Sequence, residues 1–313
     1  MKEFLSRLLV RPQTLIGLAV FAAIVVVALG APLLFPKGPF TIVGMPLLAP
    51  GSPGLPAGSD VLGRSMLVGL AYGARVSLLV GISSTCCAVG IGVLLGAVAG
   101  YYGGVVDDLL MRFTEFFQII PAFVLLMVLV AFLQPSLFST VIGIALITWP
   151  QVARVARGEF LVLRSREFVQ AAQLLGESDL HIIFRQILPN ALPPIVVVGS
   201  MMVGSAILTE SALAFLGLGD PGLMSWGSMI GASRSAMWVA WWTTVLPGLA
   251  IMVTVLALNF IGDGLRELER VERARRQRGD RDVRERIDVV LARDGDAAAH
   301  ELLGHDRRAH QQA

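Results

Sequence analysis

Residues that could carry out acid–base, metal or phosphate chemistry are scarce in this 313-residue chain. Its two lysines, Lys2 and Lys37, do not lie in a GxxxxGK[ST] sequence, so there is no phosphate-cradling loop, and we do not expect the chain to be an enzyme or to hydrolyse ATP itself. No hydrolase or metalloprotease motif is convincing, and His300, His305 and His310 fit a solvated tail better than a metal site. We therefore expect no catalytic residue, no metal ligand and no cofactor in this chain.

Glu210 is the one acid inside an apolar stretch long enough to span a membrane. A charged side chain in hydrocarbon is costly and marks a functional site by default. Glu210 also lies near the expected outer end of its helix, where Arg64 or Arg75 could pair with it. A structural ion pair is therefore favoured, and lining of a pathway or a proton relay are the alternatives.

The composition is that of an integral membrane protein with a charged end. Hydrophobic residues make up 55% and charged residues 15% of the chain, and mean hydropathy is +0.72, whereas a soluble domain has about 25% charged residues. Twelve of the 25 basic and eleven of the 23 acidic residues lie in 264–313, interleaved, which gives no nucleic-acid-binding patch. We expect a transmembrane helix and external loop in 1–65, a transmembrane domain in 66–263, and a partly disordered cytoplasmic tail in 264–313.

Apolar stretches predict an all-α, polytopic membrane protein with six transmembrane helices, since one span needs about 20 apolar residues. The first apolar run is long for a signal peptide, which favours an uncleaved helix. Gly92, Gly96 and Gly100 share one helix face, and packing within the subunit is favoured over dimerisation. The expected spans are residues 14–35, 76–100, 116–133, 138–152, 191–216 and 241–261. The span over 138–152 is short, and we expect it to continue into the helix that follows.

Positive charges orient these spans with both termini in the cytoplasm, because basic residues concentrate in cytoplasmic loops. This orientation places the polar segment 154–190 in the cytoplasm. The arginine-rich, lysine-poor composition indicates a bacterial source, so we expect the chain to cross a bacterial inner membrane. Trp226, Trp238, Trp241 and Trp242 are expected to form an interfacial aromatic belt. The basic residues assigned to the inside are Lys2, Arg7, Arg11, Arg112, Arg154, Arg157, Arg164, Arg166 and Arg185, and those assigned to the outside are Lys37, Arg64, Arg75 and Arg234.

The segment 154–190 predicts a helix–turn–helix at the membrane face. Residues 166–175 are good helix formers, and the small side chains of Ala171 and Ala172 leave a smooth surface that a partner's groove can grip. A polar loop of this size between spans calls for a partner, although an amphipathic helix pair without one is the alternative.

Three residues are expected to set the limits of the two helices in this segment. Gly176 can adopt a positive φ and end the first helix. Ser178 is a candidate N-cap for a second helix over 179–188, and Pro189 is expected to stop that helix before the next span.

Ala171-Ala172, Gly176 and Leu188-Pro189, at this spacing, resemble the EAA loop of ABC-importer membrane subunits, with Gln170 where the signature has Glu. Residues 62–81, 100–112, 208–219 and 247–267 look like the second permease of dipeptide, oligopeptide and nickel importers, so the resemblance covers about 1–267. Ser65 stands where many relatives carry Asp, a departure that bears on any local ion pair with Arg64. The candidate ATPase-coupling residues are Glu167, Gln170, Ala171, Ala172, Gly176, Arg185, Leu188 and Pro189.

The resemblance implies a permease subunit that moves peptides across the membrane by alternating access. Its implied partners are two ATPase subunits or domains that use ATP and Mg, a second permease subunit, an extracytoplasmic substrate-binding protein and membrane lipid. Nickel or a glutathione-like solute, and a homodimeric or heterodimeric pore, stay open. The alternative from the residues themselves is an ATP-independent secondary transporter or channel, which Glu210 and the helix-boundary prolines favour.

Overall fold

The computed structural model describes residues 12–271, and these residues form helices and loops without a β-strand. Five helical runs are long and apolar enough to cross a membrane: α2 (Pro12–Leu34), α3 (Met66–Tyr102), α6 (Leu137–Arg164), Asp179–Phe215 and Trp242–Val271. The bent pair α4 (Gly104–Ile119) and α5 (Ala122–Leu133) makes a sixth if it is counted as one span. The all-α, polytopic fold class is confirmed. The predictions for Lys2, Arg7 and Arg11, for the three tail histidines and for tail disorder beyond residue 271 lie outside the described residues.

The third crossing differs from the expected single span over 116–133. α4 and α5 meet at an angle of 83°, with Ile120 and Pro121 between them. Proline has no N–H to continue α4, and it drives the preceding residue into the extended conformation that Ile120 adopts. Residues 104–115, which precede the expected span, therefore belong to α4. Its first turn is held to α6 by a two-point ion pair between Asp107 and Arg157, with Nη2 and Oδ2 2.6 Å apart.

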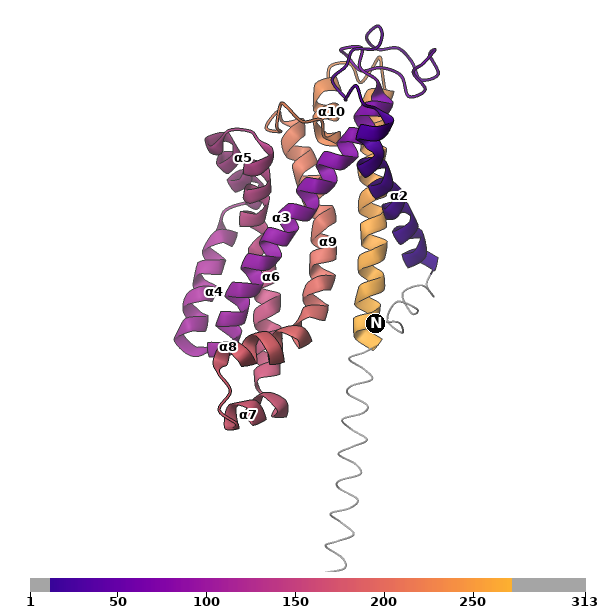
Figure 1. The fold of residues 1–313 in the computed structure, drawn as a ribbon. Helices are drawn as coiled ribbons and strands as arrows, with labels where there is room; N and C mark the ends of the chain where they lie inside the picture. The colour runs from indigo at the N-terminus through magenta and orange to yellow at the C-terminus, as the bar shows by residue number, and fades with distance from the viewer. Residues whose placement is uncertain (1–11, 272–313) are drawn as a thin grey trace, which may run out of the picture. The chain divides into compact units, whose positions relative to one another are not determined.

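Two helices are longer than the expected spans. α3 has 37 residues, which at about 1.5 Å per residue gives a length of about 55 Å, well beyond a hydrocarbon core of about 30 Å. α6 runs on past residue 152 to Arg164, as expected of a short span that continues into the next helix. The C-terminal ends of both helices lie at the end of the molecule where α7 and α8 lie (Figure 1).

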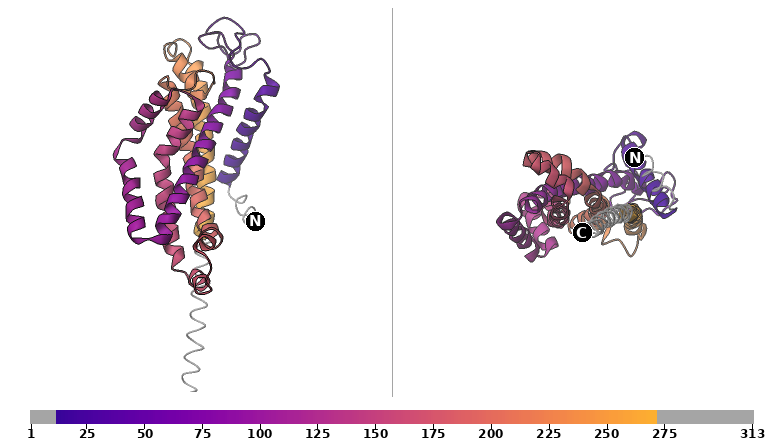
Figure 2. Two further views of the ribbon diagram at one scale, coloured as in Figure 1. Left: turned by 60° about the vertical axis from the view of Figure 1, so that its left-hand side comes forward. Right: turned by 90° about the horizontal axis from the view of Figure 1, so that it is seen from below.

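Glycines bring α3 and α6 close together. A Cβ atom added at Gly92 would lie 2.5 Å from the Cβ of Val152, and one added at Gly100 would lie 2.6 Å from the Cβ of Phe160. Gly96 faces the same helix. The stripe therefore packs inside the subunit, which confirms the prediction. Two views of the chain place α2 and the α4–α5 pair on opposite sides of the group formed by α3, α6 and α9 (Figure 2).

The tryptophans at the opposite end of these helices, beside α10 (Trp226–Ser233), do not form one belt. Trp226 and Trp242 are buried, while Trp238 and Trp241 are exposed. The indole N–H of Trp242 donates to the carbonyl of Ser59 at 3.1 Å, and that of Trp226 donates to a carbonyl of α3 at 3.0 Å. The expected belt is therefore reduced to two side chains. Of the other two, Trp242 holds the loop of residues 35–65 to the last helical run, and Trp226 holds α10 to α3.

Candidate coupling site

The first helix of the polar segment, α7 (Glu167–Leu174), forms where it was predicted and ends at Gly176 as predicted. Gly176 has a φ of +78°, which a residue without Cβ adopts freely. Its N–H donates to the carbonyl of Gln173 at 3.0 Å, and the N–H of Glu177 donates to the carbonyl of Ala172 at 3.1 Å. This pair of bonds satisfies the last carbonyls of α7 and reverses the chain.

The second helix of the segment does not stop at Pro189, so that prediction is wrong. α8 (Asp179–His181) passes into a π-helix, η1 (Ile182–Ile187), and then into α9 (Leu188–Phe215) as one run. The N–H of Leu188 bonds five residues back, to Ile183. Pro189 then stands at the start of α9, directly after the π segment, and the helical run continues through it. The loop is thus continuous with a membrane-crossing helix through a π segment, an irregularity that often marks functional sites.

One face of this loop is buried in the protein core. Val169 of α7 and Ile182 and Ile187 of η1 are completely buried and join one cluster with Phe160 of α6. Ala172 belongs to the same cluster and is 4% exposed. Ala172 was expected to share a partner-facing surface with Ala171, but helical geometry turns it inward, and only Ala171 of the pair is exposed.

Other large apolar side chains of the loop are exposed, among them Leu174, Leu175, Leu180 and Phe184, and we call these four the apolar loop surface. Leu174 is 89% and Leu175 82% exposed. Exposed apolar side chains of this size mark a contact site for another protein or for a membrane. These four residues were not among the coupling residues predicted from the sequence. The available signal was the Leu174-Leu175 pair directly before the helix-ending Gly176.

Most of the other predicted coupling residues are also exposed. Glu167, Gln170, Arg185 and Pro189 are exposed. The amide of Gln170 donates to the carbonyl of Ser165 at 3.5 Å, so it is directed back toward the end of α6. Leu188 is half-buried and packs against the core cluster.

Two side-chain hydrogen bonds meet at Tyr101, one from α3 to the loop and one from α6 to α3. The hydroxyl of Tyr101 donates to the Asp179 carboxylate at 2.7 Å, and the Arg164 guanidinium donates to the carbonyl of Tyr101 at 2.9 Å. Nothing near Tyr101 in the sequence indicates a bond to Asp179. α3, α6 and α8 are joined at this point.

Glu210 lies near the other end of α9 and is 4% exposed. The hydroxyl of Ser77 donates to its carboxylate at 3.3 Å and accepts the backbone N–H of Trp226 at 3.4 Å. Within residues 12–271 no salt bridge joins Glu210 to Arg64 or Arg75, so the expected ion pair is replaced by hydroxyl contacts. Glu210 thus connects α9, α3 and α10.

A family model described as "Binding-protein-dependent transport system inner membrane component" matches residues 92–269, which include the coupling candidates and Glu210. The di/tripeptide transport system permease protein DppC of Pseudomonas aeruginosa is 37% identical over 85% of this chain and 90% of its own length. The dipeptide transport system permease protein DppC of Alkalihalophilus pseudofirmus is 38% identical over 85% and 88%. The probable D,D-dipeptide transport system permease protein DdpC of Escherichia coli is 36% identical over 82% and 87%.

A solved structure shares the fold. A chain of the MetNI methionine ABC transporter, in an inward-facing conformation, superposes with a TM-score of 0.55 over 65% of this chain and 97% of its own. Its sequence identity is 16%, so the likeness concerns the fold alone.

Proposed function

The chain belongs to the family of binding-protein-dependent transport system inner membrane components, and we propose that the solute it carries across the membrane is a short peptide. Membership makes it a transmembrane permease subunit of an ATP-driven ABC importer. The peptide assignment is supported by the relatives named as dipeptide or di/tripeptide permeases, which match over more than four-fifths of each chain.

The apolar loop surface is the proposed docking site for a separate ATPase subunit. Leu174 and Leu175 are the most exposed of its side chains, and covering a leucine side chain is worth about 1.5–3 kcal/mol. The exposed charges of Glu167 and Arg185 would form the polar rim of that contact. We propose two ATPase subunits, a second permease subunit and an extracytoplasmic binding protein as the complete assembly.

The proposed orientation places the α7–α8 end and both termini in the cytoplasm of a bacterium, and the α10 end outside. Cytoplasmic ATP requires the ATPase-binding loop to lie on that side. The distribution of Lys and Arg over the loops favours the same orientation independently.

Force on the loop would reach the membrane helices through contacts already described. α8, η1 and α9 form one helical run, and Tyr101 joins α8 to α3. α9 and α3 meet again at the other end through Glu210 and Ser77. A push on the apolar loop surface would therefore move α9 and α3 together, as alternating access requires.

The direct test is uptake of a radiolabelled dipeptide into proteoliposomes that contain this chain with its ATPases, partner permease and binding protein. We expect accumulation that needs ATP and is lost with an ATPase variant unable to hydrolyse it. Nickel and glutathione serve as competing solutes. Uptake without ATP, or uptake of either competitor but not of the dipeptide, would contradict the proposal.

A further inference from the structure

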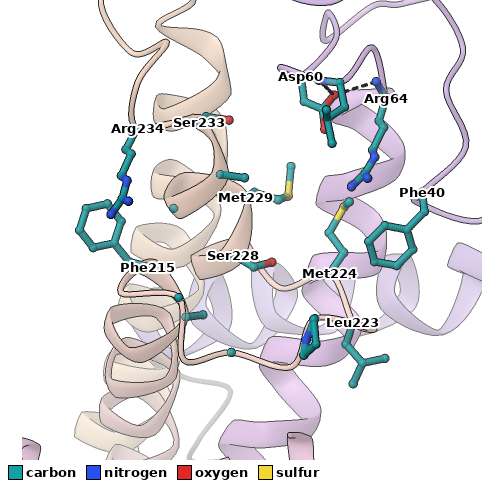
Figure 3. A pocket seen from close by; sticks show the side chains of 18 of the residues that line it. Phe40, Asp60, Arg64, Phe215, Leu223, Met224, Ser228, Met229, Ser233 and Arg234 are labelled. Carbon is teal, nitrogen blue, oxygen red and sulfur yellow. Dashed lines mark hydrogen bonds between the residues drawn. The ribbon is translucent and has the colours of Figure 1, made fainter. Parts of the chain in front are cut away.

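A cavity of about 390 Å³ lies at the α10 end, away from the coupling site (Figure 3). It forms where the first turn of α3, the end of α9, the loop 217–225 and α10 meet, and Phe40 and Asp60 of the loop 35–65 close one side. Pockets that hold small molecules occupy about 300–1,000 Å³. The cavity is therefore large enough for a small solute or for part of a larger one.

Arg64 supplies this cavity with an unsatisfied donor. Its Nε atom is buried and has no hydrogen-bond partner among the described residues. The guanidinium carbon lies 5.0 Å from the centre of the Phe40 ring, and Figure 3 shows the group directed into the cavity between Phe40 and Met224. A buried donor left unpaired is unfavourable, and a carboxylate is the partner whose geometry fits a guanidinium.

The acids that line the cavity are already engaged. One carboxylate oxygen of Asp60 accepts the backbone N–H groups of Leu62 and Arg64, each at 2.8 Å. Asp220 accepts the N–H of Gly222 at 2.8 Å and that of Leu137 at 3.0 Å. Within residues 12–271 no salt bridge joins either acid to Arg64. The Arg64 guanidinium is thus open to a carboxylate from outside the chain.

The rest of the lining suits a variable apolar group. Met66, Met224 and Met229 face the cavity, together with Phe215. Methionine side chains are flexible and polarizable, and they adapt to ligands of different shape. Figure 3 shows a second cation, Arg234, on the side opposite Arg64.

We propose that this cavity is a transient subsite for short peptides at the outer mouth of the permease. The peptide's C-terminal carboxylate binds the guanidinium of Arg64, and one of its apolar side chains lies against the methionines. This inference rests on the proposed peptide function and orientation, because the α10 end must face outside to receive the solute. It adds a carboxylate requirement that permease membership alone does not imply.

The test compares two ligands on the unmodified complex, in nanodiscs and without its binding protein. Equilibrium dialysis measures binding of radiolabelled Ala-Phe and of Ala-Phe amide, which lacks only the carboxylate charge. We expect the amide to bind at least about tenfold more weakly, the scale of a lost charge-assisted hydrogen bond. Arg64→Gln should weaken binding of the acid to the same degree and leave binding of the amide unchanged.

Two further variants test whether binding of the acid depends on the surroundings of Arg64 or on any positive charge in this part of the chain. Ser65→Asp places a carboxylate beside Arg64, at a helix N-cap that tolerates Asp, and should weaken binding of the acid by competition. Arg75→Gln removes an exposed charge of the same helix that does not line the cavity, and should leave binding unchanged.

Equal binding of acid and amide to the unmodified complex would overturn the proposal, and this comparison needs no variant to fold. Arg64→Gln could instead weaken attachment of the extracytoplasmic binding protein while the acid and the amide bind equally well. The carboxylate that pairs with Arg64 would then belong to that protein, and the proposal would also be overturned. The uptake assay keeps the two claims apart. ATP-driven dipeptide uptake without an acid–amide difference refutes only the subsite, whereas absence of dipeptide uptake refutes the peptide function.

Discussion

The hydroxyl of Tyr101 donates a 2.7 Å hydrogen bond to the carboxylate of Asp179, which joins the last turn of α3 to the first turn of α8. The backbone carbonyl of the same tyrosine accepts a bond from Arg164 at the end of α6. One residue thereby connects two long helices to the loop that carries the apolar surface. The loop can act on α3 directly, in addition to its continuity with α9.

Tyr101→Phe removes only the hydroxyl and should partly uncouple transport from ATP hydrolysis. The bond to a charged acceptor makes a loss of about 3- to 10-fold in peptide transported per ATP reasonable. The measurement is the ratio of uptake to phosphate release in proteoliposomes. Tyr102→Phe, an exposed neighbour, is the control and should leave the ratio unchanged. An unchanged ratio in Tyr101→Phe would show that this bond does not transmit the motion.

Leu174→Ser combined with Leu175→Ser should weaken attachment of the ATPase subunits. Each leucine buried at a contact contributes about 1.5–3 kcal/mol, so the pair should lower ATPase recovery at least about tenfold. Quantitative copurification measures this recovery. Met45→Ser changes an exposed apolar residue of the loop 35–65 and should not affect it. If the Leu174/Leu175 variant retained the ATPase fully, the docking surface would have to lie elsewhere.

Gly92→Ala should destabilise the subunit. The added Cβ would lie 2.5 Å from that of Val152 and 2.8 Å from the carbonyl oxygen of Trp149, so α3 and α6 would have to separate. Overpacking of this kind costs about 1–3 kcal/mol and should lower Tm in detergent. Gly90→Ala on the same helix meets nothing within 4 Å and should leave Tm unchanged or slightly raised. Equal Tm values for the two variants would contradict the packing of the glycine stripe.

Glu210→Gln should preserve transport to within about twofold, because an amide oxygen still accepts the hydrogen bond of Ser77. Glu210→Ala removes that acceptor and leaves a hole between α9, α3 and α10, so assembly and Tm should fall. Uptake and thermal unfolding together measure both effects. A glutamine variant that assembles at normal Tm but does not transport would show that the charge itself is needed along the pathway.

Structural features that depend on residues close together in the sequence were predictable. The helix over α7, its end at the positive φ of Gly176 and the packing of Gly92, Gly96 and Gly100 inside the subunit all match the structure. These features follow from propensity and spacing, which the sequence displays directly.

Features that depend on which residues pack against one another in the folded chain were not predictable. The inward turn of Ala172, the burial of Trp226 and the continuation of the helix through Pro189 depend on tertiary packing and a π turn. The break at Pro121 was visible in the sequence, but hydropathy alone does not distinguish a bent pair of helices from one span. The hydroxyl contacts of Glu210 come from helices distant in sequence.

The most direct test of the coupling loop is a cross-link from its surface. Leu174→Cys, in the assembled complex in native membranes, is treated with a short cysteine-reactive photocrosslinker, and the product is identified by mass spectrometry. We expect a product with an ATPase subunit that contains a phosphate-binding loop, and none from Met45→Cys in the loop 35–65. Membranes in which the complex is intact but Leu174→Cys cross-links only to lipid or to no ATPase would contradict the assignment of this loop as the ATPase docking site.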